Sequence, residues 1–210
     1  MPEILVLAGV NGAGKSSVVG ARLKANEIDW FNPDEYTRGL IAAGCGPEDA
    51  NARAWRYGKE RLEEAILTGA DFAFETTLGG NTIPALLRRA AATHDVHVLY
   101  VGLASVELHL QRVALRVTKG GHAIPEQKIR ERWKTSRANL CGLVPLLASL
   151  QVYDNSGTVR PGSEVPPPVL VIDYERGKLP TPAPDDVNQL ANVPDWAKCI
   201  FEAVLQVVQN

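Results

Sequence analysis

A glycine-rich stretch, AGVNGAGKSS at residues 8–17, contains the residues whose types and spacing most clearly predict chemistry. Gly9, Gly14, Lys15 and Ser16 satisfy the pattern G-x-x-x-x-G-K-[ST], and the apolar run EILVLA precedes them. Such a loop curls so that successive backbone N–H groups point at phosphate oxygens, and the dipole of the following helix adds partial positive charge. We therefore expect a site for the phosphates of ATP or GTP, with no preference encoded between the two.

Two side chains of this loop have specific expected roles. Lys15 would reach the β- and γ-phosphates, and the hydroxyl of Ser16 would hold Mg²⁺. The residues that we expect to bind the nucleotide are Gly9, Asn11, Gly12, Ala13, Gly14, Lys15, Ser16 and Ser17.

A carboxylate follows the second expected strand, IDWF at 28–31, in the stretch NPDEYTR at 32–38. A side chain at the carboxyl end of a parallel strand lies on the ligand side of the sheet. Asp34 could therefore accept the proton of an attacking hydroxyl. The alternative is that this stretch only begins a helix, with Asn32 as N-cap, Pro33 at the first helical position and Asp34 and Glu35 in the first turn.

A second polar group, FETTLGG at 74–80, follows the third expected strand at 71–75. Glu75, Thr76 and Thr77 offer a carboxylate and two hydroxyls, which suit a hydroxyl-bearing acceptor or a water molecule on Mg²⁺. The alternative is a capped helix start before TIPALLRRAAA.

Arginines gather between residues 112 and 139, around the flexible stretch TKGGH. Arg112 and Arg116 are four residues apart and share a helix face. In the next expected helix, Arg132 and Asn139 lie on one flank of an apolar stripe, and Arg130 and Arg137 lie on the other. Such an arrangement suits a lid that closes over phosphates and neutralises transition-state charge; a solvated basic face is the alternative. His122 could contact this lid or be merely a loop histidine, and we favour the loop histidine.

Apolar runs and helical patterns alternate along the chain, which predicts an α/β fold with a mainly parallel central sheet. We expect a P-loop kinase-like three-layer sandwich over residues 1–158, with an arginine-bearing helical lid at about 117–140. Residues 159–210 would form a Pro-rich connector, an added edge strand and a C-terminal helix packed on the same domain. Large P-loop ATPases and GTPases carry a second apolar strand that ends in an aspartate, which holds Mg²⁺ through water. The edge strand VLVIDY at 169–174, with Asp173, resembles such a strand but lies too late in the chain for this role.

Composition excludes several classes of protein. The formal net charge of −2 offers no overall attraction to nucleic acid or to an anionic membrane. The three cysteines are scattered and form no CxxC pair, so neither a disulfide framework nor a zinc site is indicated. No apolar run is long enough to span a bilayer and no signal peptide is evident, so we expect a cytoplasmic protein.

Taken together, AGVNGAGKSS, FNPDE, FAFETTLGG, RVALRVTKGGHAIPEQKIRERWKTSRANL and YDNSG resemble the zeta-toxin family of P-loop kinases, in its compact bacterial branch. The similarity covers roughly residues 1–158 in the same order. Zeta toxins phosphorylate the 3′-hydroxyl of UDP-N-acetylglucosamine with ATP or GTP, and an antitoxin partner blocks their nucleotide site.

The resemblance implies a role for each matching residue. Asp34 falls at the position of the catalytic base, and Glu75 and Thr77 fall where acceptor contacts are made. Arg112 matches a phosphate-binding arginine, and either Arg116 or Arg132 would supply the second. The long C-terminal extension of zeta toxins has no counterpart, so the sugar-nucleotide acceptor is implied by analogy alone.

The leading hypothesis is thus an ATP- or GTP-dependent kinase of a small hydroxyl-bearing acceptor, with Lys15, Asp34 and the arginines as catalytic residues. A nucleotide-binding toxin–antitoxin component with slow hydrolysis is the alternative from another class. A nucleic-acid end kinase is disfavoured by the charge and by the lack of a basic-aromatic groove.

Overall fold

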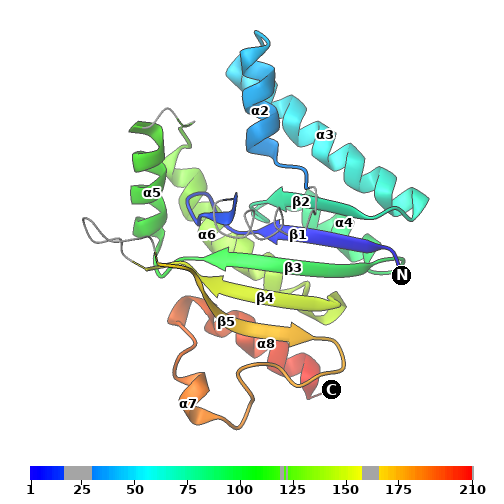
Figure 1. Cartoon of the computed structure of the whole chain (residues 1–210), viewed down its shortest axis with the longest axis vertical. Helices are drawn as coiled ribbons and strands as arrows, with labels where there is room; N and C mark the ends of the chain where they lie inside the picture. Colours follow the sequence, from blue (N-terminus) through cyan, green and yellow to red (C-terminus); the bar gives the residue numbers. More distant parts are fainter. Residues whose placement is uncertain (17–29, 119–120, 122, 158–165, 210) are drawn as a thin grey trace.

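The computed structural model describes residues 1–16, 30–118, 121, 123–157 and 166–209 (Figure 1). The strands are β1 (Glu3–Ala8), β2 (Phe72–Thr76), β3 (Asp95–Gly102), β4 (Ser149–Asp154) and β5 (Val169–Glu175). The helices are α2 (Pro33–Ala42), α3 (Pro47–Thr68), α4 (Thr82–Ala90), α5 (Val106–Thr118), α6 (Glu126–Cys141), α7 (Val187–Leu190) and α8 (Lys198–Val208), with 3-10 turns η1 (Val144–Leu146) and η2 (Asp195–Ala197).

The five strands form one sheet in the order β2-β1-β3-β4-β5. The pairs β1–β2, β1–β3 and β3–β4 are parallel, and β5 is added antiparallel to β4 at the edge. The chain leaves β1 toward β2 on one side and later returns to β3 on the other. Ligands of open α/β sheets bind at such a switch point, beyond the carboxyl ends of the strands, and here the glycine-rich loop follows β1.

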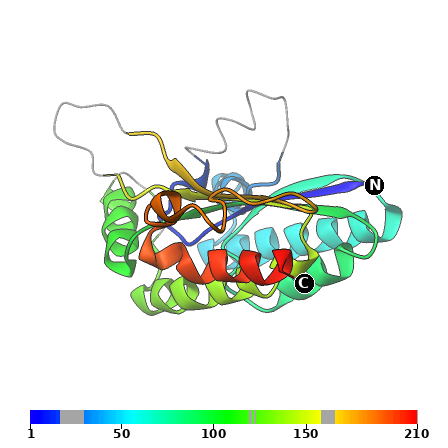
Figure 2. The same cartoon turned by 90° about the horizontal axis from the view of Figure 1, so that it is seen from below.

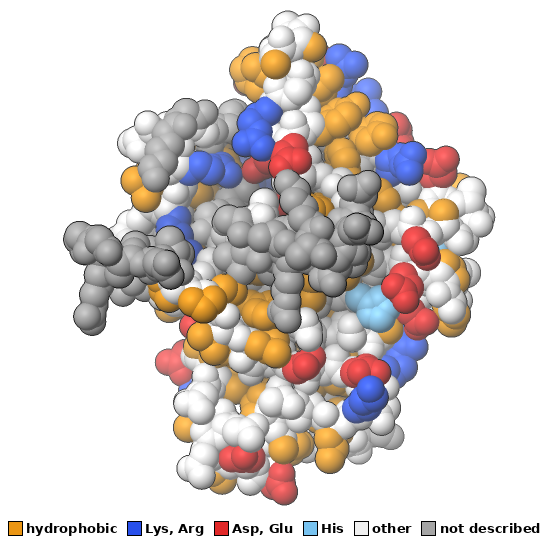
Figure 3. Space-filling view, viewed as in Figure 1, with side chains coloured by type: hydrophobic (Ala, Val, Ile, Leu, Met, Phe, Trp, Pro, Cys, Tyr) orange, Lys and Arg blue, Asp and Glu red, His pale blue; other side chains and the backbone are white. Residues whose placement is uncertain are grey.

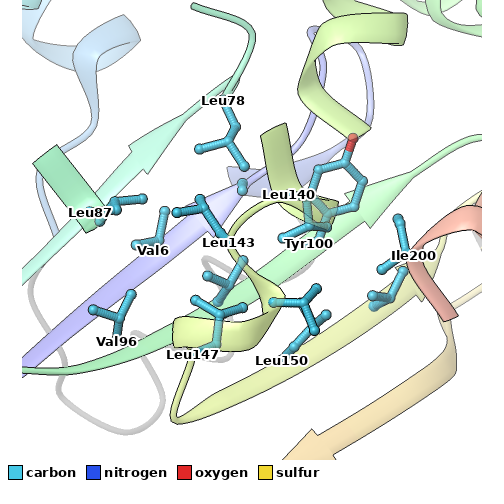
Figure 4. Packing of buried hydrophobic residues seen from close by; sticks show 14 of the residues in the cluster. Val6, Leu78, Leu87, Val96, Tyr100, Leu140, Leu143, Leu147, Leu150 and Ile200 are labelled. Carbon is cyan, nitrogen blue, oxygen red and sulfur yellow. The ribbon is translucent and has the colours of Figure 1, made fainter. Parts of the chain in front are cut away.

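The main core lies on one face of the sheet, which α3, α4, α6 and α8 cover (Figure 2). Alternate residues of each strand point into it because successive side chains of a strand face opposite sides. Figure 4 shows Val6, Val96, Tyr100 and Leu150 of the sheet packed against Leu140 of α6 and Ile200 of α8. The opposite face carries a smaller cluster of Leu7, Ala13, Val101 and Tyr153. These observations confirm the α/β class and the mainly parallel sheet.

The helix boundaries follow local signals in the sequence. The side chain of Asn32 accepts hydrogen bonds from the backbone N–H groups of Asp34 (3.0 Å) and Glu35 (3.3 Å), so Asn32 caps α2 as expected. Helix α3 begins at Pro47, and Gly69 ends it in the left-handed conformation that glycine adopts most readily. The edge strand expected at 169–174 is confirmed as β5.

Three expected elements differ from the structure or fall outside it. The third strand runs from Phe72 to Thr76 and thus lies one residue later than expected. Most of the helix expected from Lys15 to about Ala25 and half of the strand expected at 28–31 lie outside the described residues, as do Ser17, Lys119 and His122. Phe31 nevertheless forms a parallel bridge with Phe74, as a strand beside β2 would. Among the described helices, none is long and apolar enough to cross a bilayer.

Helix α5 supports the glycine-rich loop through the side chain of His109. This side chain is 1% exposed, and its Nδ1–H donates to the backbone carbonyl of Asn11 at 2.8 Å. Burial lowers the pKa of His109 to about 4, against the weaker opposing effect of that hydrogen bond. The imidazole is therefore neutral at physiological pH and acts as a fixed donor to the loop.

Burial of a neutral histidine makes stability depend on pH. Because the pKa is lower in the folded than in the unfolded protein, its contribution is complete above about pH 6.5 and is lost as the pH falls toward 4. We expect His109 to account for about 2 kcal/mol of the loss in unfolding free energy between pH 7 and pH 5. Urea unfolding of the wild type and of His109→Gln at both pH values measures this loss. An identical loss in the two proteins would show that His109 does not titrate in this way.

Candidate functional site

The glycine-rich loop turns sharply after β1, and its glycines allow the turn. Gly9, Gly12 and Gly14 all have positive φ angles. A Cβ atom on Gly9 would lie 2.2 Å from the carbonyl oxygen of Val101 in β3, so no side chain fits there. The backbone N–H of Ala13 donates to the carbonyl of Val10 at 3.1 Å and closes the turn.

Three side chains meet where this loop passes the end of β2. The ammonium of Lys15 lies 3.3 Å from Oε1 of Glu75, and the Ser16 hydroxyl donates to Oε2 of Glu75 at 2.7 Å. Lys15 and Glu75 are 7% and 9% exposed, so the pair is nearly buried. A buried charge is tolerated only when it is paired and hydrogen-bonded. Glu75 is therefore part of the same group as Lys15 and Ser16 of the glycine-rich loop.

The same group offers suitable ligands for Mg²⁺. The Ser16 hydroxyl and the Glu75 carboxylate are hard oxygen donors 2.7 Å apart, beside an ammonium that a phosphate oxygen can also contact. Mg²⁺ prefers oxygen ligands and usually keeps several waters, so two protein oxygens and nucleotide phosphates form a reasonable set. These residues fit the metal that the sequence motif implies.

Asn11 connects the loop with helix α6. Its side-chain oxygen accepts a hydrogen bond of 2.7 Å from Nη1 of Arg132, while its backbone carbonyl accepts from His109. Partial burial lowers the pKa of Arg132, which the charge of Asp34 counteracts. The guanidinium stays protonated, since arginine retains its proton in proteins. Arg132 is thus held at the phosphate-binding loop.

Asn155 fixes the other side of the loop. This buried side chain follows β4 and donates through Nδ2 to the backbone carbonyl of Ala13 at 2.8 Å. In turn, Nη2 of Arg112 donates to the carbonyls of Asn155 (2.7 Å) and Gly157 (3.2 Å). Arg112 is therefore anchored by the segment after β4 while it lines the site.

Asp34 lies at the start of α2 and lines the same cavity as the glycine-rich loop. Its carboxylate accepts a hydrogen bond of 3.3 Å from Arg116 of α5, and both side chains are partly exposed. The capping of α2 uses the side chain of Asn32 and only the backbone N–H of Asp34. The start of α2 therefore leaves the Asp34 carboxylate available for another role. In Figure 3, Lys and Arg side chains gather on this face between α5 and α2, with an acidic side chain beside α2.

The loop that follows Glu75 is held by helix α6. The hydroxyl of Thr76 accepts from the N–H of Leu78, and the hydroxyl of Ser136 donates to the carbonyl of Thr77 at 2.7 Å. The amide of Asn139 donates to the carbonyls of Leu78 and Gly80. Helix α4 begins only at Thr82 and has no side-chain cap, so the interpretation of this stretch as a capped helix start is wrong.

One cavity of about 1010 Å³ joins these groups, a volume at the upper end of small-molecule sites. The residues expected from the sequence that line it are Asn11, Gly12, Gly14, Lys15, Ser16, Asp34, Glu75, Thr76, Thr77, Arg112, Arg116 and Arg132. Asn139 does not line the cavity and instead holds the loop after β2 through its hydrogen bonds to Leu78 and Gly80. Gly9 and Ala13 belong to the turn after β1 but do not line the cavity either.

The second flank of α6 makes structural contacts. Arg130 forms ion pairs with Glu107 and Glu126, and Arg137 stacks 3.7 Å over the ring of Trp133 and donates to the carbonyl of Trp196. The arginines of this helix thus divide, with Arg132 at the cavity and the other two outside it.

Two supports of the site were missed by sequence reasoning. His109 is three residues before Arg112 and seven before Arg116, so its position on the same helix face was a usable signal. Asn155 directly follows β4, so the rule about the carboxyl ends of parallel strands, which we applied to Asp34 and Glu75, applies to it as well.

Comparison with known proteins gives one curated relative and several structural neighbours. No family model matches the chain. An uncharacterized protein of Haemophilus influenzae is 32% identical over 135 residues, which are 62% of this chain and 92% of that protein.

The structural neighbours are P-loop proteins. A crystal structure of AvrRxo1-ORF1 with AvrRxo1-ORF2 and sulphate ions matches 93% of this chain with a TM-score of 0.60 and 16% identity. This chain spans 64% of that neighbour, and 58% of the chain in a related structure that contains ATP. A structure of the PezAT chromosomal toxin–antitoxin system of Streptococcus pneumoniae matches 73% of this chain and 68% of its own, with a TM-score of 0.53 and 14% identity.

These likenesses confirm the fold that the resemblance to zeta toxins implies. A putative kinase from Chloroflexus aurantiacus has the same architecture, with a TM-score of 0.51 at 13% identity, over 65% of this chain and 79% of its own. The chain therefore has the fold of zeta-toxin-like P-loop kinases and belongs to the same family as the Haemophilus influenzae protein.

Proposed function

We propose that the protein is a phosphotransferase that moves the γ-phosphoryl group of ATP or GTP to a hydroxyl of a small acceptor. One observation carries the proposal: the Lys15–Ser16–Glu75 group and the Asp34 carboxylate line the same cavity. A nucleotide whose phosphates occupy the loop would direct its γ-phosphate into this cavity. The remaining volume toward α2 and α3 is then the acceptor site.

In the proposed reaction, the Asp34 carboxylate accepts the proton of the acceptor hydroxyl as its oxygen attacks the γ-phosphorus. The bond between the γ-phosphorus and the bridging oxygen breaks, and the nucleoside diphosphate leaves. Lys15, Arg112, Arg116 and Arg132 neutralise the charge on the transferring group. The ion pair of Asp34 with Arg116 is partly exposed and therefore weak, so an acceptor and a phosphate can replace it.

Ser16 and Glu75 would hold Mg²⁺, which when bound would neutralise the negative charge that develops on the phosphate oxygens. This assignment places Glu75 at the metal rather than at the acceptor, because both of its oxygens already contact Lys15 and Ser16. Thr76 and Thr77 remain candidates for acceptor contacts, since both line the cavity.

By resemblance, the proposed acceptor is UDP-N-acetylglucosamine, and a protein antitoxin is a proposed partner. The PezAT neighbour is part of a toxin–antitoxin system, which supports the second point. A mass-spectrometric screen tests the acceptor directly: the protein, Mg²⁺ and ATP are incubated with a sugar-nucleotide and metabolite pool. We expect UDP-N-acetylglucosamine to gain the mass of one phosphoryl group, and no gain on it would exclude this acceptor.

Replacing Asp34 with Asn should separate chemistry from nucleotide binding. The amide keeps the size of the side chain but cannot accept the proton, so kcat should fall by about 10²- to 10⁴-fold. The Kd for a fluorescent ATP analogue should change little, because Asp34 does not contact the glycine-rich loop. Steady-state kinetics and a binding titration measure both, and unchanged turnover would remove Asp34 from the mechanism.

Replacing Glu75 with Gln should weaken the binding of Mg²⁺. The neutral amide weakens the Mg²⁺ site, and we expect the Mg²⁺ concentration for half-maximal rate to rise by about 10- to 100-fold. Asp34→Asn serves as the matched control, because it lowers the rate without changing that concentration. Since the change also leaves Lys15 without a buried counter-charge, a thermal unfolding curve must accompany the assay. An unaltered Mg²⁺ dependence in folded Glu75→Gln would contradict the assignment.

A further inference from the structure

Helix α3 forms the wall of the cavity that faces away from the glycine-rich loop. Glu48, Asn51, Trp55 and Lys59 line the cavity and follow one another at intervals of three, four and four residues. This spacing puts them on one face of the helix. The known motifs of the chain assign no role to this stripe.

The wall is held in place by aromatic packing. Gly58 allows the ring of Phe31 to lie against α3, because a Cβ atom there would come 2.5 Å from the ring. Phe31 also contacts Tyr36 of α2 and Tyr57 of α3, with ring centroids 5.6 and 5.4 Å away, and these two tyrosines stack at 4.8 Å. The hairpin of α2 and α3 is thereby fixed beside β2, as Figure 1 shows. A ligand would meet a preformed surface.

Trp55 differs from these packed rings. It lines the cavity and yet is 53% exposed, while its neighbour Ala54 is buried. An indole is a large flat apolar surface, and stacking a ring on it contributes about 0.5–1.5 kcal/mol beyond area burial. A half-exposed tryptophan in a concave site, next to a few polar groups, is typical of a ligand-binding wall.

The charges on this wall indicate which acceptors fit. Lys59 pairs with Glu63 at 2.8 Å, and Arg38 of α2 lies 3.9 Å from Glu35. Asp34 pairs with Arg116, and Glu48 adds a carboxylate to the wall, so the cations that α2 and α3 contribute to the cavity lie beside carboxylates. A polynucleotide needs a basic track for its phosphates. A ring with several hydroxyls instead matches an indole face, a carboxylate and an amide, since the carboxylate accepts hydrogen bonds and the amide both accepts and donates them.

We infer that Trp55, with Asn51 and Glu48, forms a carbohydrate-binding subsite in which a pyranose ring of the acceptor stacks on the indole. This inference rests on the proposed function, because it assigns the acceptor end of the same cavity. Stacking orients the ring so that one of its hydroxyls faces Asp34 and the glycine-rich loop. Trp55 is thus a specificity-determining residue and not a catalytic one.

Fluorine NMR of the full chain labelled with 5-fluorotryptophan tests the contact without relying on turnover. The chain has four tryptophans, and single Trp→Phe variants assign their resonances. We titrate N-acetylglucosamine 1-phosphate, UDP-N-acetylglucosamine, UMP and a non-hydrolysable ATP analogue separately. The two sugar-containing probes should shift the Trp55 resonance and leave that of buried Trp196 in place; UMP and the ATP analogue should not shift Trp55. A Trp55 resonance that is indifferent to both sugar probes, or that follows UMP instead, overturns the inference.

Kinetics distinguish a failure of this inference from a failure of the proposed function. In Trp55→Ala, the KM for the acceptor should rise about tenfold with kcat nearly unchanged, and Trp55→Phe should recover most of the loss. Leu67→Ala is the matched control, since Leu67 is 79% exposed at the far end of the same helix. Transfer to a sugar with an unchanged KM in Trp55→Ala overturns the subsite and leaves the kinase intact. A sugar-dependent shift of Trp55 without any transfer supports the subsite and contradicts the proposed reaction.

Discussion

The buried contact of Glu75 with Lys15 and Ser16 joins the loop after β1 to the end of β2, and the rest of the site is arranged around it. Parallel pairing of these strands brings their carboxyl ends to the same edge of the sheet, with Ala8 opposite Thr76. A lysine this deeply buried requires a counter-charge, and a carboxylate this deeply buried requires donors. Lys15 and Glu75 therefore neutralise each other's charge within the protein. The same group offers the ammonium and the oxygen ligands that a nucleotide and its metal would need.

Around this pair, three segments that are distant in the sequence hold the loop by its backbone and by Asn11. His109 supports the carbonyl of Asn11 from α5, Asn155 donates to the carbonyl of Ala13 from the end of β4, and Arg132 donates to the side chain of Asn11 from α6. Helix α6 also holds the loop after β2 through Ser136, which accepts from the buried hydroxyl of Tyr100, since its own proton is donated to Thr77. A shift of α6 would thus move its contacts with both the glycine-rich loop and the loop after β2. Helix α6 is therefore physically connected to both of these loops.

The sequence was most informative where local rules decide the structure. The glycine-rich loop, the cap at Asn32, the ends of α3 and the added strand β5 all depend on residues close to one another in the chain. The same holds for the strand-end rule that brought Asp34 and Glu75 to one cavity. Contacts between distant segments were not predictable in this way. The spacing of α6 separates Arg132 from Arg130 and Arg137, but it does not show that Arg132 faces Asn11. The partners of each flank depend on how α6 docks against α5 and η2. The face of α3 that lines the cavity belongs to the same class, since it depends on how α3 docks beside β2.

The central claim is that the γ-phosphoryl group passes to a hydroxyl and not to water. Phosphorus NMR of a reaction containing the protein, Mg²⁺, ATP and UDP-N-acetylglucosamine follows the γ-phosphorus directly. The account predicts that its signal disappears as that of a new phosphate monoester grows, with inorganic phosphate as a minor product. If the γ-phosphorus appears only as inorganic phosphate, at a rate that no added acceptor changes, the protein is a slow nucleotide hydrolase and the account is wrong.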